Sequence, residues 1–200
     1  IDPGEQCDFN NLGGETCITQ GFPGGGTLAC DQNCGFDTSM CVDVSNPLTV
    51  CVNPNLQITG NGPGMQNPST ITIADAGTVT DVDVSIDCLH TWPGDLLFRV
   101  EHGGNSSQII DQPGVPMSLF GCSTDNIDAT IDDEGLQTAE DTCNLLPPGL
   151  GSPPNLTPLN PLTIFDGGSM TGDWDLIIDD AYPQGDDGTL LQWCVTITWQ

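Results

Sequence analysis

Acidic residues gather at three places in the sequence where they could bind a hard cation. They are Asp95, the run Asp132-Asp133-Glu134, and Asp179-Asp180 followed by Asp186-Asp187. Ca²⁺ prefers six to eight oxygen ligands from carboxylates, carbonyls and water, and short aspartate side chains in loops supply them. Like charges on neighbouring loops repel one another unless salt screens them or a cation bridges them. Calcium binding is therefore one expectation, and solvated turn aspartates in salty water are the alternative.

Catalytic chemistry finds little support in the residue types and their spacing. Ser169 in G-G-S-M is the serine with glycines before it, but the signature that should surround a nucleophilic serine is missing. His90 is expected to be structural, and no H-E-x-x-H motif is present for a zinc protease. Cys30, Cys34 and Cys41 lack a fourth nearby zinc ligand. We therefore expect no enzyme activity from this chain.

Cysteine content and charge place the protein outside the cell and away from polyanions. The chain has 10 cysteines, and this density predicts disulfides in an oxidising compartment. We expect all of them to pair: Cys7, Cys17, Cys30, Cys34, Cys41, Cys51, Cys88, Cys122, Cys143 and Cys194. A formal charge of −27 with a single Lys or Arg excludes nucleic acids and disfavours anionic membranes as partners. The sequence shows neither a membrane-spanning run nor a signal peptide, and we expect the signal to have been removed or to lie outside the sequence given.

Hydrophobic periodicity predicts strands over most of the chain. Residues 1–45 are loop-like and need disulfides to fold, and residues 46–68 form a Pro/Asn/Gly-rich connector that holds Cys51 and a possible edge hairpin. From residue 69 to 200, strict alternation predicts strands over 81–88 and 191–199, the latter with Leu191 and Trp193 on one face. Shorter strands are expected near 70–74, 95–101, 106–110, 127–131, 161–165 and 173–179. The fold class is therefore all-β: an antiparallel jelly-roll β-sandwich with a small disulfide-stapled N-terminal segment.

Two stretches resemble known families. The opening I-D-P-G-E-Q-C-D resembles a cysteine-rich repeat of bacterial secreted and surface proteins, although the segment that usually precedes it there is absent. From residue 69 onward, several motifs occur in the order found in the P domain, the β-sandwich that follows the catalytic domain in proprotein convertases and many bacterial exoproteases. They are D-V-D-V-S-I-D (81–87), H-T-W-P-G-D-L-L (90–97), I-D-D-E (131–134), P-L-T-I-F-D-G (161–167), G-D-W-D-L-I-I-D-D (172–180) and G-D-D-G-T-L-L-Q-W-C-V-T-I (185–197).

The P-domain resemblance implies calcium held by loop aspartates. Carried over position by position, it favours Asp95, Asp132, Asp133, Asp179, Asp180 and Asp186 as ligands. It also implies that the module stabilises a neighbouring catalytic domain or contacts substrate. The cysteines from Cys88 onward and the insert around 144–160 depart from the pattern and indicate a stapled, decorated variant.

Three functions follow as expectations. The first is a calcium-stabilised structural or adhesion module at the cell surface, whose edge strands pair with neighbouring copies in a filament. The second is an accessory P domain of a larger secreted protease. The third is a carbohydrate-binding module that uses Trp92, Trp174, Trp193 and Trp199, although tryptophans in strands more often pack in a core. Two sequons, at Asn105 and Asn155, are candidate glycosylation sites in predicted loops.

Overall fold

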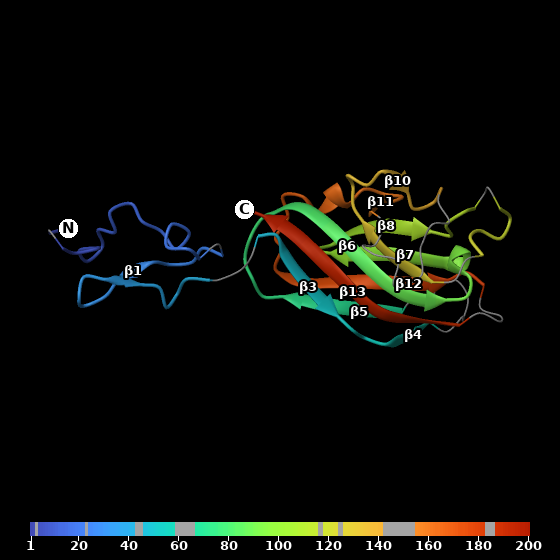
Figure 1. The fold of residues 1–200 in the computed structure, drawn as a ribbon, viewed down its shortest axis with the longest axis horizontal. Helices are drawn as coiled ribbons and strands as arrows, with labels where there is room; N and C mark the ends of the chain where they lie inside the picture. Colours follow the sequence, from blue (N-terminus) through green and yellow to red (C-terminus); the bar gives the residue numbers. More distant parts are fainter. Residues whose placement is uncertain are drawn as a thin grey trace.

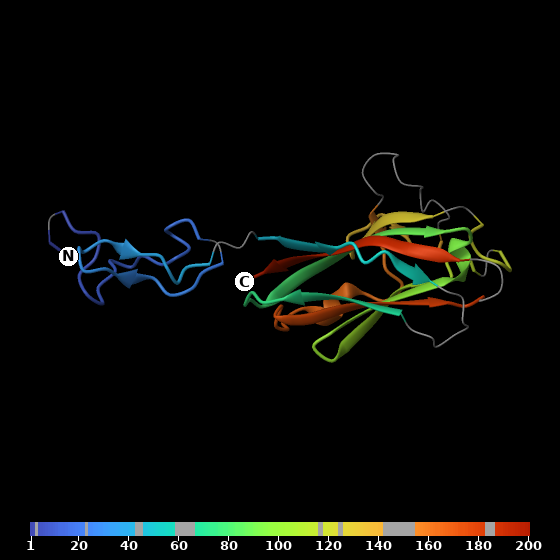
Figure 2. The same cartoon turned by 90° about the horizontal axis from the view of Figure 1, so that it is seen from below.

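The computed structural model describes residues 1–2, 4–22, 24–42, 46–58, 67–115, 118–123, 126–141, 155–182 and 187–200. Two β-sheets stack face to face and form a sandwich, and a small N-terminal segment precedes it (Figures 1 and 2). No helix in these ranges is long and apolar enough to cross a membrane. The all-β sandwich expected from the alternation is confirmed.

The larger sheet has the strand order β10-β11-β9-β6-β13-β3, and β4 also pairs with β13. Its strands are β3 (Leu48–Val52), β4 (Leu56–Ile58), β6 (Val79–His90), β9 (Ile127–Ile131), β10 (Gln137–Thr138), β11 (Asn155–Thr157) and β13 (Gly188–Trp199). The smaller sheet has the order β5-β12-β7-β8, formed by β5 (Asn67–Ile73), β7 (Leu96–His102), β8 (Asn105–Asp111) and β12 (Gly172–Asp180). The pairs β10–β11 and β11–β9 are parallel, and the other described pairs are antiparallel. Two strands, β3 and β4, come from the 46–68 segment, which was expected to be a connector with an edge hairpin.

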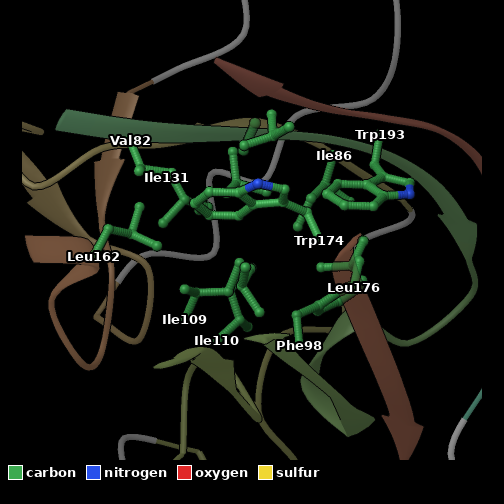
Figure 3. Packing of buried hydrophobic residues seen from close by; sticks show 14 of the residues in the cluster. Val82, Ile86, Phe98, Ile109, Ile110, Ile131, Leu162, Trp174, Leu176 and Trp193 are labelled. Carbon is green, nitrogen blue, oxygen red and sulfur yellow. The ribbon is translucent and has the colours of Figure 1, made fainter. Parts of the chain in front are cut away.

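The core lies between the sheets and follows from the period of two along each strand. On β6, Val82, Val84 and Ile86 are buried, whereas Asp83 and Asp87 point to the outer face. Trp174 and Trp193 are fully buried and lie among aliphatic side chains from both sheets (Figure 3). Burying apolar surface of this kind is the main force that holds the two sheets together.

A β-bulge in β13 corrects the expected face of one residue. The pairing of β13 with β6 shifts register between Leu190 and Gln192. Because the bulge adds one residue to β13, Leu190 is fully buried and Leu191 is only half-buried, so the prediction that Leu191 shares the core face with Trp193 is wrong.

The strand predicted near 161–165 is also wrong, because this stretch forms the 3₁₀ helix η2 (Leu162–Phe165). Leu162 and Phe165 are three residues apart, so one 3₁₀ turn brings both to the same side, where they are buried, while Ile164 is 47% exposed. A second 3₁₀ helix, η1 (Pro93–Asp95), precedes β7.

The N-terminal segment contains a two-stranded sheet, β1 (Ala29–Cys30) and β2 (Phe36–Asp37). Its disulfides are Cys7–Cys30 and Cys17–Cys41, and a third disulfide, Cys51–Cys194, joins β3 to β13 across the larger sheet. Cys122 is also disulfide-bonded, and Cys143 lies outside the described residues.

The prediction that every cysteine pairs is wrong for Cys34 and Cys88, which are free thiols. Cys88 is on the core face of β6 and is fully buried, so burial raises the pKa of its thiol. Cys34 is partly exposed, and its thiol contacts the Glu5 carboxylate, which raises the thiol pKa.

Candidate functional site at one end of the sandwich

The end of the sandwich where β6 and β12 finish brings together residues that are far apart in the sequence. Asp95 is the last residue of η1, Asp180 is the last residue of β12, and both are buried. The backbone N–H of Ala181 donates to the carbonyl oxygen of Asp95 at 2.8 Å, so the two segments are in direct contact. Asp95 and Asp180 were both predicted as calcium ligands, and they lie at the same end of the fold.

His90 faces Asp180 beneath this surface. The backbone N–H of Trp92 donates to His90 Nδ1 at 3.1 Å, so in the neutral ring the proton is on Nε2. Nε2 is 3.7 Å from Asp180 Oδ2, and both side chains are almost completely buried. The other carboxylate oxygen, Oδ1, accepts the backbone N–H of Tyr182 at 2.9 Å.

A glycine keeps room for this histidine. A Cβ at Gly188 would lie 2.5 Å from His90 Cδ2 and 2.5 Å from the carbonyl oxygen of Leu89. No side chain fits there without displacing β6, so glycine at residue 188 is required by the close approach of β13.

Asp179 points away from Asp180. Successive side chains of β12 alternate between faces, and Asp179 pairs with Leu97 on the outer side of the smaller sheet. Its Oδ1 is buried and has no hydrogen-bond partner among the described residues. The adjacent aspartates therefore do not converge on one point.

Asp132 and Asp133 lie at the opposite end of β9 and already make structural hydrogen bonds. Asp132 accepts the backbone N–H of Glu134 at 2.7 Å and Asn155 Nδ2 at 3.0 Å. Asp133 accepts the backbone N–H groups of Leu162 at 2.9 Å and Thr163 at 2.8 Å, which caps the start of η2. The sequence-predicted ligands thus fall into separate groups.

The oxygen donors at both places suit Ca²⁺ in chemical type, but they do not form a complete site. In the described ranges, no group of three or more His, Cys, Asp or Glu side chains is placed to hold a metal ion. Asp186, the remaining predicted ligand, lies outside the described residues.

An acidic surface on the larger sheet was missed by sequence reasoning. The pairing of β6 with β9 brings Asp83 close to Asp132 and Asp133, which are about 50 positions later in the chain. Partial burial raises the pKa of Asp83 to about 6, and the neighbouring carboxylates add to this rise. Strand register, which sequence alone does not give, creates this cluster.

Exposed apolar side chains flank η1 at the same end as Asp95 and Asp180. Leu119 is 88% exposed, Phe120 is 63% exposed and Tyr182 is 57% exposed. We call Val115, Leu119, Phe120 and Tyr182 the end patch. Its exposure was not predictable, because nothing in the sequence distinguishes a buried loop leucine from an exposed one.

The loop that carries Leu119 and Phe120 is held in place by hydrogen bonds. Gly94 N–H donates to Cys122 O at 3.0 Å, and Cys122 N–H donates to Pro113 O at 2.8 Å. Trp92 Nε1 donates to Phe120 O at 2.5 Å. The Cys122 disulfide adds a covalent restraint. The apolar side chains of a loop held by these bonds are therefore exposed to solvent.

The two histidines of the chain are not arranged for nucleophilic catalysis. His102 is buried, and its ring nitrogens lie 2.8 Å from Asp173 O and 2.7 Å from Ser169 O. Ser169 Oγ accepts the backbone N–H of Thr171 at 3.1 Å, and neither histidine contacts a serine hydroxyl in the described part of the chain. A Ser-His-Asp arrangement is absent from these residues.

The four tryptophans and the two sequons lie in different parts of the sandwich. Trp174 and Trp193 are core residues, and Trp92 and Trp199 are half-buried, so no shared platform for a sugar ring is formed by Trp174 and Trp193. Both sequons were expected in loops. Instead, Asn105 is the first residue of β8 and Asn155 is the first residue of β11.

No family model matches the chain, and neither does any curated protein. Among solved structures, the chain is similar to two from Aeromonas sobria. One is a complex of a serine protease with the chaperone ORF2, and the other is the serine protease. The sequence identities are 16% and 15%, each over 87% of this chain, and the TM-score is 0.47 in both. The chain spans 33% of the length of the matched chains.

Proposed function

We propose that this chain is a non-catalytic, extracellular β-sandwich module that packs through the end patch against a neighbouring domain of a larger secreted protease. The observation that carries the proposal is the exposure of Leu119 and Phe120 on a loop restrained by hydrogen bonds and a disulfide. Because these side chains stay exposed, they contribute little hydrophobic free energy to folding. A fixed backbone lowers the entropy that a docking loop loses on binding.

Exposed apolar patches mark protein-binding surfaces, and aromatic side chains are enriched in such surfaces. The order of P-domain-like motifs supports the choice of partner, since P domains stabilise a neighbouring catalytic domain. The absence of a Ser-His-Asp arrangement in the described residues supports a non-catalytic role.

Calcium binding at the same end belongs to the proposal. Asp95 and Asp180 would supply carboxylate oxygens, with Asp186 as a further ligand, and a bound cation would offset the repulsion between them. Asp132 and Asp133 are weaker candidates because their oxygens already accept hydrogen bonds within the fold.

The calcium part is tested by thermal unfolding of the chain in CaCl₂ and in EGTA. We expect Ca²⁺ to raise the melting temperature and EGTA to reverse the rise, since a ligand bound only by the folded state stabilises it. Asp180→Asn should abolish the rise in melting temperature. Asp141→Asn, which changes an exposed aspartate that follows β10, should keep it. An equal rise in both variants would contradict the assignment.

The docking part is tested on the whole secreted polypeptide that contains this chain. If a catalytic domain is present, we expect Leu119→Ser/Phe120→Ser to lower the melting temperature of that domain, as the module no longer packs against it. Met40→Ser, which changes an exposed apolar residue of the N-terminal segment, serves as the control. Equal melting temperatures for the double variant and the control would overturn the proposal.

A second candidate is a structural subunit of a surface filament. Figure 1 shows the N-terminal segment beyond one end of the sandwich, and head-to-tail contacts between a segment of this kind and another copy produce open filaments. Negative-stain electron microscopy in calcium and after EGTA separates the two candidates. Ordered fibres that fray on chelation favour the filament, and dispersed particles in both conditions leave the accessory module.

A further inference from the structure

A groove on the N-terminal segment carries an inference that is independent of the sandwich. Its volume is about 570 Å³, and its walls are mostly apolar. The turn that contains Phe9 forms one side, and Leu28 and Ala29 form part of the other. No residue of the sandwich lines it.

Phe9 is at a backbone position that a large side chain rarely takes. Asp8 and Asn11 exchange both backbone hydrogen bonds, at 2.9 and 2.7 Å, so Phe9 and Asn10 form a two-residue hairpin turn. The φ angle of Phe9 is +51°, in the left-handed region. Turns of this length normally place glycine, asparagine or aspartate at the first central position.

The strain at Phe9 is not offset by packing. The side chain is 88% exposed, so it gains little from burial. A residue that breaks a local rule without a benefit to folding is expected at a functional position. The exposed ring at the edge of an apolar groove is therefore available to a ligand.

The charges around the groove indicate what the ligand must be. Asp8 and Asp31 line it, and Glu5 contacts Cys34 on the same side. Residues 1–42 contain no Lys, Arg or His. The one basic residue of Lys or Arg type in the whole chain, Arg99, already contacts Glu101 at 2.9 Å. A second copy of this chain therefore brings no charge that complements the groove.

We propose that this groove binds a segment of another protein in which an apolar side chain lies next to a Lys or Arg. The apolar side chain packs against Phe9 and Leu28, and the cation lies near Asp8. The proposal concerns a different part of the chain from the end patch, so either can fail without the other.

The test is an NMR titration of the full chain with capped pentapeptides. We expect Gly-Leu-Arg-Leu-Gly to shift the amide signals of Phe9, Leu28 and Ala29, and added NaCl to weaken the effect because salt screens the charges. Gly-Leu-Glu-Leu-Gly, which reverses the charge, and Gly-Gly-Arg-Gly-Gly, which removes the apolar side chains, should bind far more weakly.

Variants separate binding from folding. Phe9→Gly relieves the strained turn and should leave the remaining amide spectrum unchanged, yet bind the first peptide about tenfold more weakly. Asp8→Asn should weaken binding and reduce its salt dependence, while Met40→Ser should bind as the unmodified chain does. Equal binding of the Arg and Glu peptides, full affinity in Phe9→Gly, or no shift with any peptide would each overturn the proposal.

Discussion

The imidazole of His102 lies flat against the indole of Trp174, with ring centroids 3.9 Å apart and ring planes only 3° from parallel. Both nitrogens of the imidazole face backbone carbonyl oxygens, those of Asp173 and Ser169. Carbonyl oxygens only accept hydrogen bonds, so a ring N–H of His102 is the donor to this backbone. The stacked ring thus links the end of β7, where His102 lies, to β12 and to Ser169.

His102→Phe keeps a ring against Trp174 but removes the imidazole that hydrogen-bonds the buried backbone at Asp173 and Ser169, so we expect it to lower the free energy of unfolding by about 1–3 kcal/mol. Urea unfolding measures the loss. An unchanged free energy of unfolding in His102→Phe would contradict a stabilising role for these hydrogen bonds.

Asp83 makes stability depend on pH in a defined direction. Its pKa rises from 3.8 to about 6 on folding, first through burial and then through nearby carboxylates. The folded state therefore binds more protons than the unfolded state between these values, so stability decreases as the pH rises through that range.

We expect the urea midpoint to fall between pH 4 and pH 6 and the slope to be smaller in Asp83→Asn. Glu140, whose pKa burial raises to about 7, acts in the same direction, and Glu140→Gln should flatten the curve further. Asp187→Asn, which changes an exposed aspartate, is the control. An unchanged slope in Asp83→Asn would show that the cluster does not control the pH response.

Asp133 stabilises the start of η2 through hydrogen bonds from two backbone N–H groups. Asp133→Ala removes the acceptors for the N–H groups of Leu162 and Thr163, and we expect a loss of about 1–3 kcal/mol in the free energy of unfolding. Urea unfolding should show this loss equally in CaCl₂ and in EGTA. A loss that appears only in calcium would assign Asp133 to a metal site instead.

The free thiols should differ sharply in reactivity. In the folded protein, iodoacetamide should modify Cys34, which is partly exposed, and spare Cys88, which is fully buried. In denaturant both should react. Peptide mapping by mass spectrometry identifies the modified residues. Rapid modification of Cys88 in the folded protein would mean that the core at β6 opens readily.

The sequence predicted the sandwich because alternation is a local property. Val82, Val84 and Ile86 alternate with Asp83 and Asp87 within one strand, so β6 is visible without knowledge of its neighbours. The bulge near Leu191 was not visible, because it depends on how β13 pairs with β6. Leu162 and Phe165 were misread because their spacing of three is too short to separate a 3₁₀ turn from a strand.

The candidate sites depend still more on tertiary structure. Asp95 and Asp180 are 85 positions apart and are brought to the same end by the pairing of Asp180 with Leu96 and the hydrogen bond from Ala181 to Asp95. Carboxylate type predicted a cation site, but only strand register separates Asp132 and Asp133 from that end. The strain at Phe9 has no signal in its residue type, which alone would place it in a core.

The pairing of β3 with β13 has a mechanical consequence. Asn46 and Trp199 exchange hydrogen bonds at 2.7 and 3.2 Å, so the start of β3 and the end of β13 lie side by side. Tension applied between residues 46 and 200 would peel β3 from β13 one pair at a time. The Cys51–Cys194 disulfide joins these two strands, so their separation stops after the first few residue pairs. As long as the disulfide remains oxidised, it carries the force, and the rest of the sandwich does not.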